Sequence, residues 1–78
     1  MVTPDSIEAS IVAGLECEHC RVAGDGQHFE AVIVSRAFAG QSRVKRHQLV
    51  YGALGDRMRE EIHALSMKTL TPEEWAAG

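Results

Sequence analysis

The residues of this 78-residue chain that could bind a metal ion or carry redox chemistry are its four histidines and two cysteines. Imidazole nitrogen and thiolate sulfur are the donors that zinc and iron–sulfur clusters take from proteins, and paired thiols also carry redox chemistry. Cys17 and Cys20 are separated by two residues, whereas His28 and His63 are distant in sequence and each stands where an apolar stretch begins. Which of these side chains act together depends on the elements that position them.

The Cys17-Glu18-His19-Cys20 segment could be a redox pair or half of a zinc site. Zinc needs about four ligands, the sequence has no second CxxC, and His19 lies between the cysteines, where its geometry is poor. A thioredoxin-like pair would begin a helix after a strand, but this segment follows a predicted helix and precedes a predicted strand. We interpret the pair as structural, with metal or redox chemistry as the alternative.

The pattern of caps, turns and apolar periods predicts an α+β fold. We expect, in chain order, a helix from Pro4 capped by Thr3, strands at 20–23 and 28–36, a long helix capped by Ser42, a strand at 62–67, and a short helix from Pro72 capped by Thr71. Gly52 and Gly55 are expected to bend or split the long helix. The chain length suits one domain at 1–78, with helices packed on a three-stranded mixed sheet.

Apolar spacing predicts the buried side of the helices. In the long helix Val44, Tyr51 and Met58 recur every seven residues, with Leu54 between them, so this stripe is predicted to face the sheet. In the closing helix Trp75 is the predicted apolar anchor.

The chain order places the two histidines at one edge of the sheet. Strands 28–36 and 62–67 are joined through a helix, and such a crossover makes two strands parallel. Because parallel strands begin at the same edge, His28 and His63 should lie close together. Cys17 and Cys20 should lie ~10 Å or more away, at about 3.3 Å per strand residue. Two imidazoles cannot complete a coordination sphere, so a metal here would need ligands from a partner protein, unless both are hydrogen-bonded surface residues.

A basic cluster, Arg43, Lys45, Arg46 and His47, occupies the first turn of the long helix. It could bind phosphate together with the free backbone N–H groups there, and the alternative is a solvated basic face. The segment GALG at 52–55 matches the GxxG loop of KH domains but lacks its usual basic residue. We do not expect this segment to clamp nucleic acid.

Composition excludes several classes of protein. The formal net charge of −3 argues against a mainly electrostatic nucleic-acid binder, and two cysteines are too few for a secreted disulfide scaffold. No stretch approaches the roughly 20 apolar residues of a membrane span, and the acidic N-terminus, MVTPDSIEAS, does not resemble a signal peptide. The serines lack a nucleophile-elbow context. We therefore expect a cytoplasmic protein that is not an enzyme.

Three motifs in this order strongly resemble the BolA family. They are FxGxSRxxRHxxVY at 38–51, IHALS at 62–66 and KTxTPEEW at 68–75, and VxGDGxHF at 22–29 is most similar to the family's short bacterial, IbaG-like branch. The resemblance covers nearly the whole chain. It implies a class II KH-like fold, α-β-β-α-α-β plus a short C-terminal helix, in agreement with the order expected above.

The resemblance also implies a function. BolA-like proteins pair with monothiol glutaredoxins and share a [2Fe–2S] cluster, to which the glutaredoxin supplies a cysteine and a bound glutathione thiol. By position, His63 matches the family's histidine at the last strand, and His28 lies in the turn that matches its variable histidine-or-cysteine loop. His47 is a less expected ligand, and the CEHC segment is assigned nothing. No cluster is expected in the isolated chain, which should be a monomer or weak homodimer.

The alternative implied by the resemblance is a transcriptional regulator, because the fold class is KH-like and some BolA relatives are described as regulators. The residues that would bind nucleic acid are Arg43, Lys45, Arg46 and His47.

Overall fold

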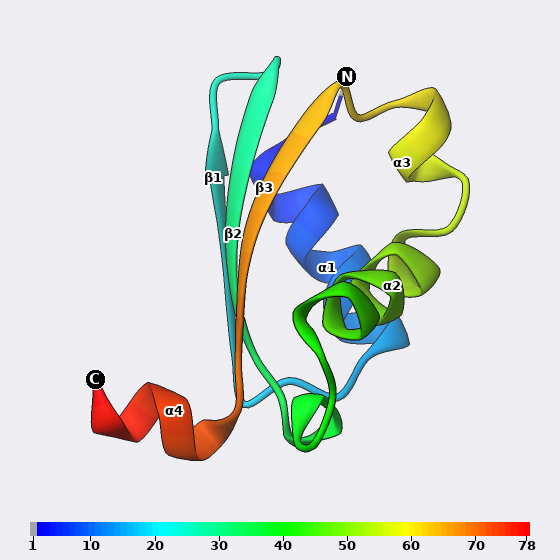
Figure 1. Ribbon diagram of the computed structural model, residues 1–78. Helices are drawn as coiled ribbons and strands as arrows, with labels where there is room; N and C mark the ends of the chain where they lie inside the picture. The colour runs from blue at the N-terminus through cyan, green and yellow to red at the C-terminus, as the bar shows by residue number, and fades with distance from the viewer. Residues whose placement is uncertain (1) are drawn as a thin grey trace.

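A computed structural model describes residues 2–78, so Met1 of the predicted domain 1–78 lies outside the described residues. The elements are α1 (Pro4–Gly14), β1 (His19–Gly24), β2 (His28–Val34), the 3-10 helix η1 (Arg36–Phe38), α2 (Arg43–Leu54), α3 (Arg57–Glu60), β3 (Ala64–Leu70) and α4 (Pro72–Ala77). These residues form a three-stranded sheet with α1 and α2 packed on one face, and α3 lies next to α2 (Figure 1). The predicted α+β order is confirmed.

The sheet has the order β1-β2-β3, with β1 antiparallel to β2 and β2 parallel to β3. The predicted mixed sheet and its helical crossover are therefore confirmed. The predicted end of the last strand at residue 67 is wrong, because pairing with β2 continues to Leu70, opposite Val34. The predicted end of the second strand at residue 36 is also wrong, because the Ser35 side chain accepts from the N–H of Ala37 and begins η1.

Local hydrogen bonds begin the helices where the sequence predicts them. The hydroxyl groups of Thr3, Ser42 and Thr71 each accept from a backbone N–H in the first turn of α1, α2 and α4. The long helix is split as expected: α2 ends at Leu54, and Gly55 has a φ of 60°, a value that favours glycine.

The predicted stripe of the long helix is wrong at Val44 and Tyr51 but right at Leu54, which is in the core, and at Met58, which packs against it. Val44 and Tyr51 are 67% and 40% exposed, whereas Val50 and Leu54 are buried. The split at Gly55 also separates Met58, now in α3, from the spacing of α2. The buried side of α2 is the one that contacts α1 and β3, and its apolar residues are three to four positions apart rather than seven.

The core lies between the sheet and the helices on its covered face. Its fully buried large side chains come from α1, β2, η1 and α2: Ile7, Ile11, Phe29, Ile33, Phe38 and Val50. Within residues 2–78, none of the helices combines the length and apolar character that crossing a lipid bilayer requires.

Helix α4 lies beyond the end of β3, on the side of the sheet away from α1 and α2 (Figure 1). Trp75, the predicted apolar anchor of this helix, is 48% exposed and does not enter the core. Its ring instead stacks on His19 of β1, with centroids 4.8 Å apart and planes at 19°. No residue of α4 is buried, so this stack and the contacts of α4 with β3 attach it at the surface of the described residues.

Candidate functional site

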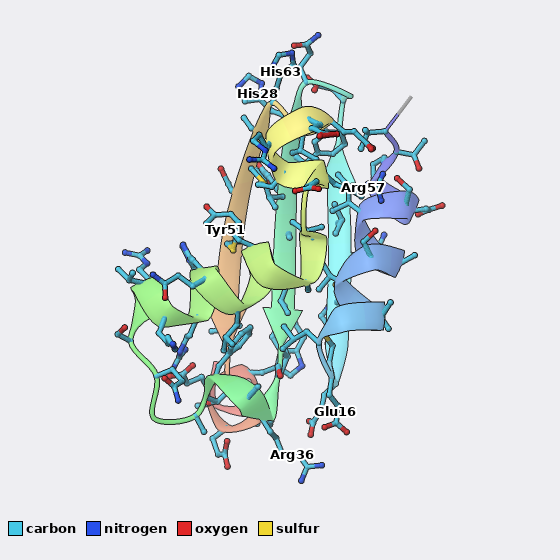
Figure 2. All side chains as sticks on the ribbon, turned by 90° about the vertical axis from the view of Figure 1, so that its right-hand side faces the viewer. Glu16, His28, Arg36, Tyr51, Arg57 and His63 are labelled. Carbon is cyan, nitrogen blue, oxygen red and sulfur yellow. The ribbon has the colours of Figure 1, made fainter. Side chains whose placement is uncertain are left out.

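His28 and His63 lie side by side at one edge of the sheet. His28 is the first residue of β2 and is the register partner of Ala64, the first residue of β3. His63 directly precedes Ala64, so the parallel register brings the two histidines to neighbouring positions (Figure 2). Both are exposed. The predicted shared edge is confirmed, with His63 one residue before the strand rather than within it.

A tight turn between β1 and β2 positions His28. A carboxylate oxygen of Asp25 accepts from the backbone N–H groups of Gln27 and His28, each at 2.9 Å. These hydrogen bonds hold the pKa of the Asp25 carboxyl below its usual value, and the bond from His28 has the largest effect. Gly26 has a φ of 100°, and a Cβ on Gly24 would lie 2.5 Å from the carbonyl oxygen of His28. The sequence Gly-Asp-Gly therefore allows this turn and the close approach of β2.

A partly buried arginine network holds the residue before His63. The Arg57 guanidinium donates to the carbonyl oxygen of Ser6 at 2.9 Å and to the hydroxyl of Ser10 at 2.7 Å, both in α1. The backbone N–H of Ile62 donates to the carbonyl of Arg57, and the Ile62 side chain is buried in the core. Ile62, the residue before His63, is thus held both by its backbone hydrogen bond and by the packing of its side chain. Sequence analysis missed this network, since its partners are about fifty positions apart.

This edge can offer two imidazole nitrogens to a metal. Among residues 2–78, no three His, Cys, Asp or Glu side chains are grouped so that they could hold an ion. A [2Fe–2S] cluster takes four ligands and accepts two imidazoles on one iron. Two exposed imidazoles at one edge therefore fit half of such a ligand set, provided that a second molecule supplies the other half.

The cysteines lie at the other end of the sheet. Cys20 is paired with Ile33, five residues beyond His28 along β2, which corresponds to roughly 16 Å at about 3.3 Å per residue. Figure 2 shows Glu16, next to Cys17 in the chain, at the end of the molecule opposite His28. The prediction that the cysteines do not join the histidines is confirmed.

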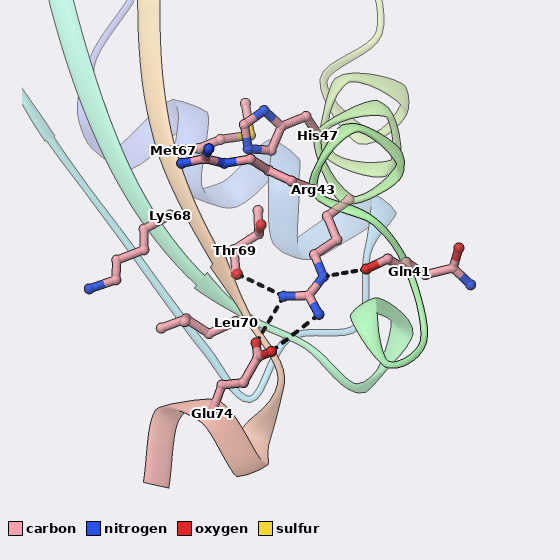
Figure 3. A pocket seen from close by; sticks show the side chains of 9 residues that line it. Gln41, Arg43, His47, Met67, Lys68, Thr69, Leu70 and Glu74 are labelled. Carbon is pink, nitrogen blue, oxygen red and sulfur yellow. Dashed lines mark hydrogen bonds and ion pairs between the residues drawn. The ribbon is translucent and has the colours of Figure 1, made fainter. Parts of the chain in front are cut away.

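The basic cluster is divided by the fold. Arg43 and Lys45 are exposed, but the Arg46 side chain is only 14% exposed. Its guanidinium donates to the carbonyl of Thr69 at 3.1 Å and to the carboxylate of Glu74 at 2.8 Å (Figure 3). The bond from Arg46 is the main reason why the pKa of Glu74 lies below its usual value. Arg46 therefore joins α2 to β3 and α4, while Arg43 and Lys45 remain accessible.

An open groove of about 560 Å³ lies between the start of α2 and the end of β3. The Nε2 atom of His47, on its wall, is buried without a hydrogen-bond partner among the described residues. The groove combines cationic, polar and apolar side chains, drawn in Figure 3: Gln41, Arg43, Arg46, His47, Met67, Lys68, Thr69, Leu70 and Glu74.

Comparison with known proteins places the chain in a family. Residues 3–74 match the family model BolA, described as BolA-like protein. The acid stress protein IbaG of Escherichia coli strain K12 is 41% identical over 73 residues, covering 92% of this chain and 87% of that protein. The DNA-binding transcriptional regulator BolA of Haemophilus influenzae is 44% identical over 54 residues, covering 69% of this chain and 52% of that protein.

The solved structure of a BolA protein homologue from Coxiella burnetii superposes with a TM-score of 0.84 and is 49% identical, covering 97% of this chain and 99% of that one. The names of these relatives describe a stress protein and a regulator and indicate no catalytic activity. The predicted IbaG-like resemblance is confirmed. With a family match that spans nearly all of its sequence, the chain belongs to the BolA family.

Proposed function

We propose that this BolA-family chain is an adaptor that pairs with a monothiol glutaredoxin and shares the ligation of a [2Fe–2S] cluster with it in iron–sulfur trafficking or iron homeostasis. His63 and His28 are the ligands from this chain, and the partner contributes a cysteine and a bound glutathione. The observation that carries the proposal is the position of two exposed imidazoles at neighbouring positions of one sheet edge.

The surroundings of the two histidines suit this role. Both rings reach solvent, so a partner can approach without unfolding the chain. Neutral imidazoles in place of thiolates make a bound cluster less negative and raise its reduction potential. The chain's own contribution is to hold the donors at fixed positions, through Asp25 for His28 and through Arg57 for His63.

The remaining expectations belong to the same proposal. The isolated chain carries no cluster of its own and is a monomer or a weak homodimer. It works in the cytoplasm, where a monothiol glutaredoxin with glutathione is available to it.

The test is to mix the chain with a monothiol glutaredoxin that carries its cluster and to record the visible absorption and circular dichroism spectra. A new spectrum that requires this chain, and that is lost when both His28 and His63 are replaced by alanine, supports the proposal. His19→Ala is the matched control, because this histidine lies on β1 and stacks on Trp75. The same spectrum with the double variant would refute imidazole ligation.

A second candidate function is binding of nucleic acid as a transcriptional regulator. It is favoured by the name of the Haemophilus relative and by the exposure of Arg43 and Lys45 beside the groove. The net charge of −3 and the internal contacts of Arg46 count against it. DNA titrations at several salt concentrations decide whether the chain binds nucleic acid, because phosphate contacts make the binding affinity fall steeply as salt rises. This dependence on salt should become shallower in Arg43→Ala and Lys45→Ala.

A further inference from the structure

The two edges of the sheet differ in how they are protected. The strand order β1-β2-β3 leaves the outer sides of β1 and β3 without a neighbouring strand. On β1, a carboxylate oxygen of Glu8 in α1 accepts from the backbone N–H of Val22 at 3.1 Å, so this edge is blocked near its middle. A strand edge without such a block can pair with another extended chain. The outer side of β3 is an edge of this second kind.

The hydrogen bonds of β3 show which of its backbone groups face outward. The carbonyl of Leu70 accepts from the N–H of Ser35, just beyond β2, so Leu70 and every second residue before it face β2. The residues between them, Leu65, Met67 and Thr69, direct their N–H and C=O groups away from β2. The Thr69 carbonyl is occupied by a side chain of α2. Within residues 2–78, the N–H and C=O groups of Leu65 and Met67 have no hydrogen-bond partner.

The groove between the start of α2 and the end of β3 runs along this edge and offers positive charge on both faces of the sheet. Met67 packs toward the core, whereas the next side chain, Lys68, is exposed on the opposite face. Figure 3 shows Lys68 on one side of β3, and Arg43 and His47 on the other. Arg43 and Lys68 are exposed and make no ion pair within residues 2–78. The Nε2 atom of His47 is buried without a partner there.

We propose that the outer edge of β3 binds an extended, acidic peptide segment of a partner protein, which adds to the sheet as a fourth strand. The residue of the segment opposite Met67 exchanges backbone hydrogen bonds with it and directs its side chain toward α2, where a carboxylate meets Arg43 and His47. The next side chain points to the opposite face, where a second carboxylate meets Lys68. The backbone bonds supply affinity, and the two carboxylates select the sequence.

The charges and the shape of the groove favour this occupant over two others. Two copies of the chain paired through β3 would bring Arg43 and Lys68 of one copy next to those of the other, and like charges across paired strands are destabilising. Nucleic acid is bound by grooves that combine cations with aromatic rings. Among the described residues, those that line this groove include no Phe, Tyr or Trp, and the carboxylate of Glu74 lies at one end.

The experiment uses the isotope-labelled full chain without glutaredoxin, so it is independent of the cluster proposal. The probe is a capped peptide of sequence Thr-Val-Glu-Glu-Val-Thr, whose binding is followed by fluorescence anisotropy and by amide hydrogen exchange in NMR spectra. We expect the peptide to slow the exchange of the Leu65 and Met67 N–H groups much more than that of Ser66 and Lys68. Only the first two face the added strand, since the other two already face β2.

Changes in the peptide separate strand pairing from charge attraction. Methylation of both glutamate nitrogens removes the donor that reaches the Met67 carbonyl, and it should weaken binding at least about fivefold. Replacement of both glutamates by glutamine removes the charges but keeps the backbone donors, and it should weaken binding by roughly the same factor.

Variants of the chain test the two cations. Arg43→Gln and Lys68→Gln should each weaken peptide binding by about two- to fivefold. Arg59→Gln is the matched control and should bind like wild type, because Arg59 lies in α3 and does not line the groove.

Four results would overturn the proposal. They are no binding at about 1 mM peptide, equal affinity for the methylated peptide, exchange that slows equally at all four amides, and slow exchange of Leu65 and Met67 through self-association without peptide. A single-stranded oligothymidine that displaces the peptide would likewise overturn it and assign the groove to nucleic acid.

Discussion

Arg46 and Glu74 are 28 positions apart in sequence, yet their side chains form an ion pair at 2.8 Å that joins α2 to α4. The same guanidinium also donates to the carbonyl of Thr69 in β3. One side chain therefore holds three elements together at the end of the sheet opposite the two histidines. Glu74 in turn accepts from the backbone N–H of Thr71, which caps α4.

Removing the Arg46 side chain should destabilise the fold. Arg46→Ala leaves the Thr69 carbonyl without this donor and Glu74 without its partner, so we expect the free energy of unfolding to fall by about 1–3 kcal/mol. Urea denaturation measures this change. Lys45→Ala is the control, because this neighbouring side chain is exposed and should change stability by less than about 0.5 kcal/mol. Equal losses in the two variants would contradict the structural role of Arg46.

Stability should decline in acid through two carboxylates. Asp25 and Glu74 have pKa values below their usual range because both accept hydrogen bonds in the folded state. A carboxyl whose pKa is lowered by folding stabilises the protein above its unfolded pKa of about 4, and that contribution is lost as the pH falls through the folded value. The free energy of unfolding should therefore be flat from about pH 7 to 5 with respect to these groups and should fall below about pH 4.

Asp25→Asn and Glu74→Gln should each make this acid decline shallower, as urea denaturation at a series of pH values would measure. Glu73→Gln is the control for Glu74, because the neighbouring Glu73 makes no ion pair within residues 2–78. An unchanged slope in both Asp25→Asn and Glu74→Gln would show that these hydrogen bonds are not linked to the acid transition.

Replacing each of two helical glycines by alanine should change the free energy of unfolding in opposite directions. A Cβ on Gly14 would lie 2.9 Å from the Cα atom of Ala53, so Gly14→Ala must push α1 and α2 apart and should cost about 1–3 kcal/mol. A Cβ on Gly52 would have no atom of residues 2–78 within 4 Å outside its own stretch of helix, and Gly52→Ala should stabilise α2 by about 0.5–1 kcal/mol. Thermal and urea unfolding measure both changes. Destabilisation by both variants would mean that the two helices tolerate no added methyl group.

The two proposed ligands should differ in importance. His63→Ala should weaken the spectrum of the mixed complex more than His28→Ala, because Ile62 before His63 is bonded to Arg57, which is anchored on α1, whereas the turn before His28 is held by the exposed Asp25. A titration of each variant against cluster-loaded glutaredoxin gives the two apparent affinities. Equal losses, or a larger loss in His28→Ala, would refute this ranking.

Arg57 should affect cluster binding only by holding His63 in position. Arg57→Gln breaks the hydrogen bonds to Ser6 and Ser10, so we expect lower stability and a weaker mixed-complex spectrum, although the side chain is no ligand. Arg59→Gln is the matched control, because Arg59 is exposed and its one ion pair within residues 2–78 is with Asp56, three residues earlier. A spectrum that is intact in Arg57→Gln, at a temperature where the variant is fully folded, would exclude this positioning role.

The sequence by itself determined the local helices and strands and the helical connection between β2 and β3. The caps at Thr3, Ser42 and Thr71 depend on hydrogen bonds that span three residues, so they are visible in sequence. The parallel pairing follows from the helical connection between β2 and β3, and with it the meeting of His28 and His63 at one edge. The motifs that resemble the BolA family carried the proposed function.

Only the tertiary structure decided which side of α2 is buried and where its charged residues go. Heptad spacing favoured Val44, but the packing of α2 on α1 and β3 buries Val50 instead. The partners of Arg46 likewise depend on how separate elements pack. Such contacts are chosen by the fit of whole surfaces, and this fit is set by residues far apart in the chain rather than by any local pattern.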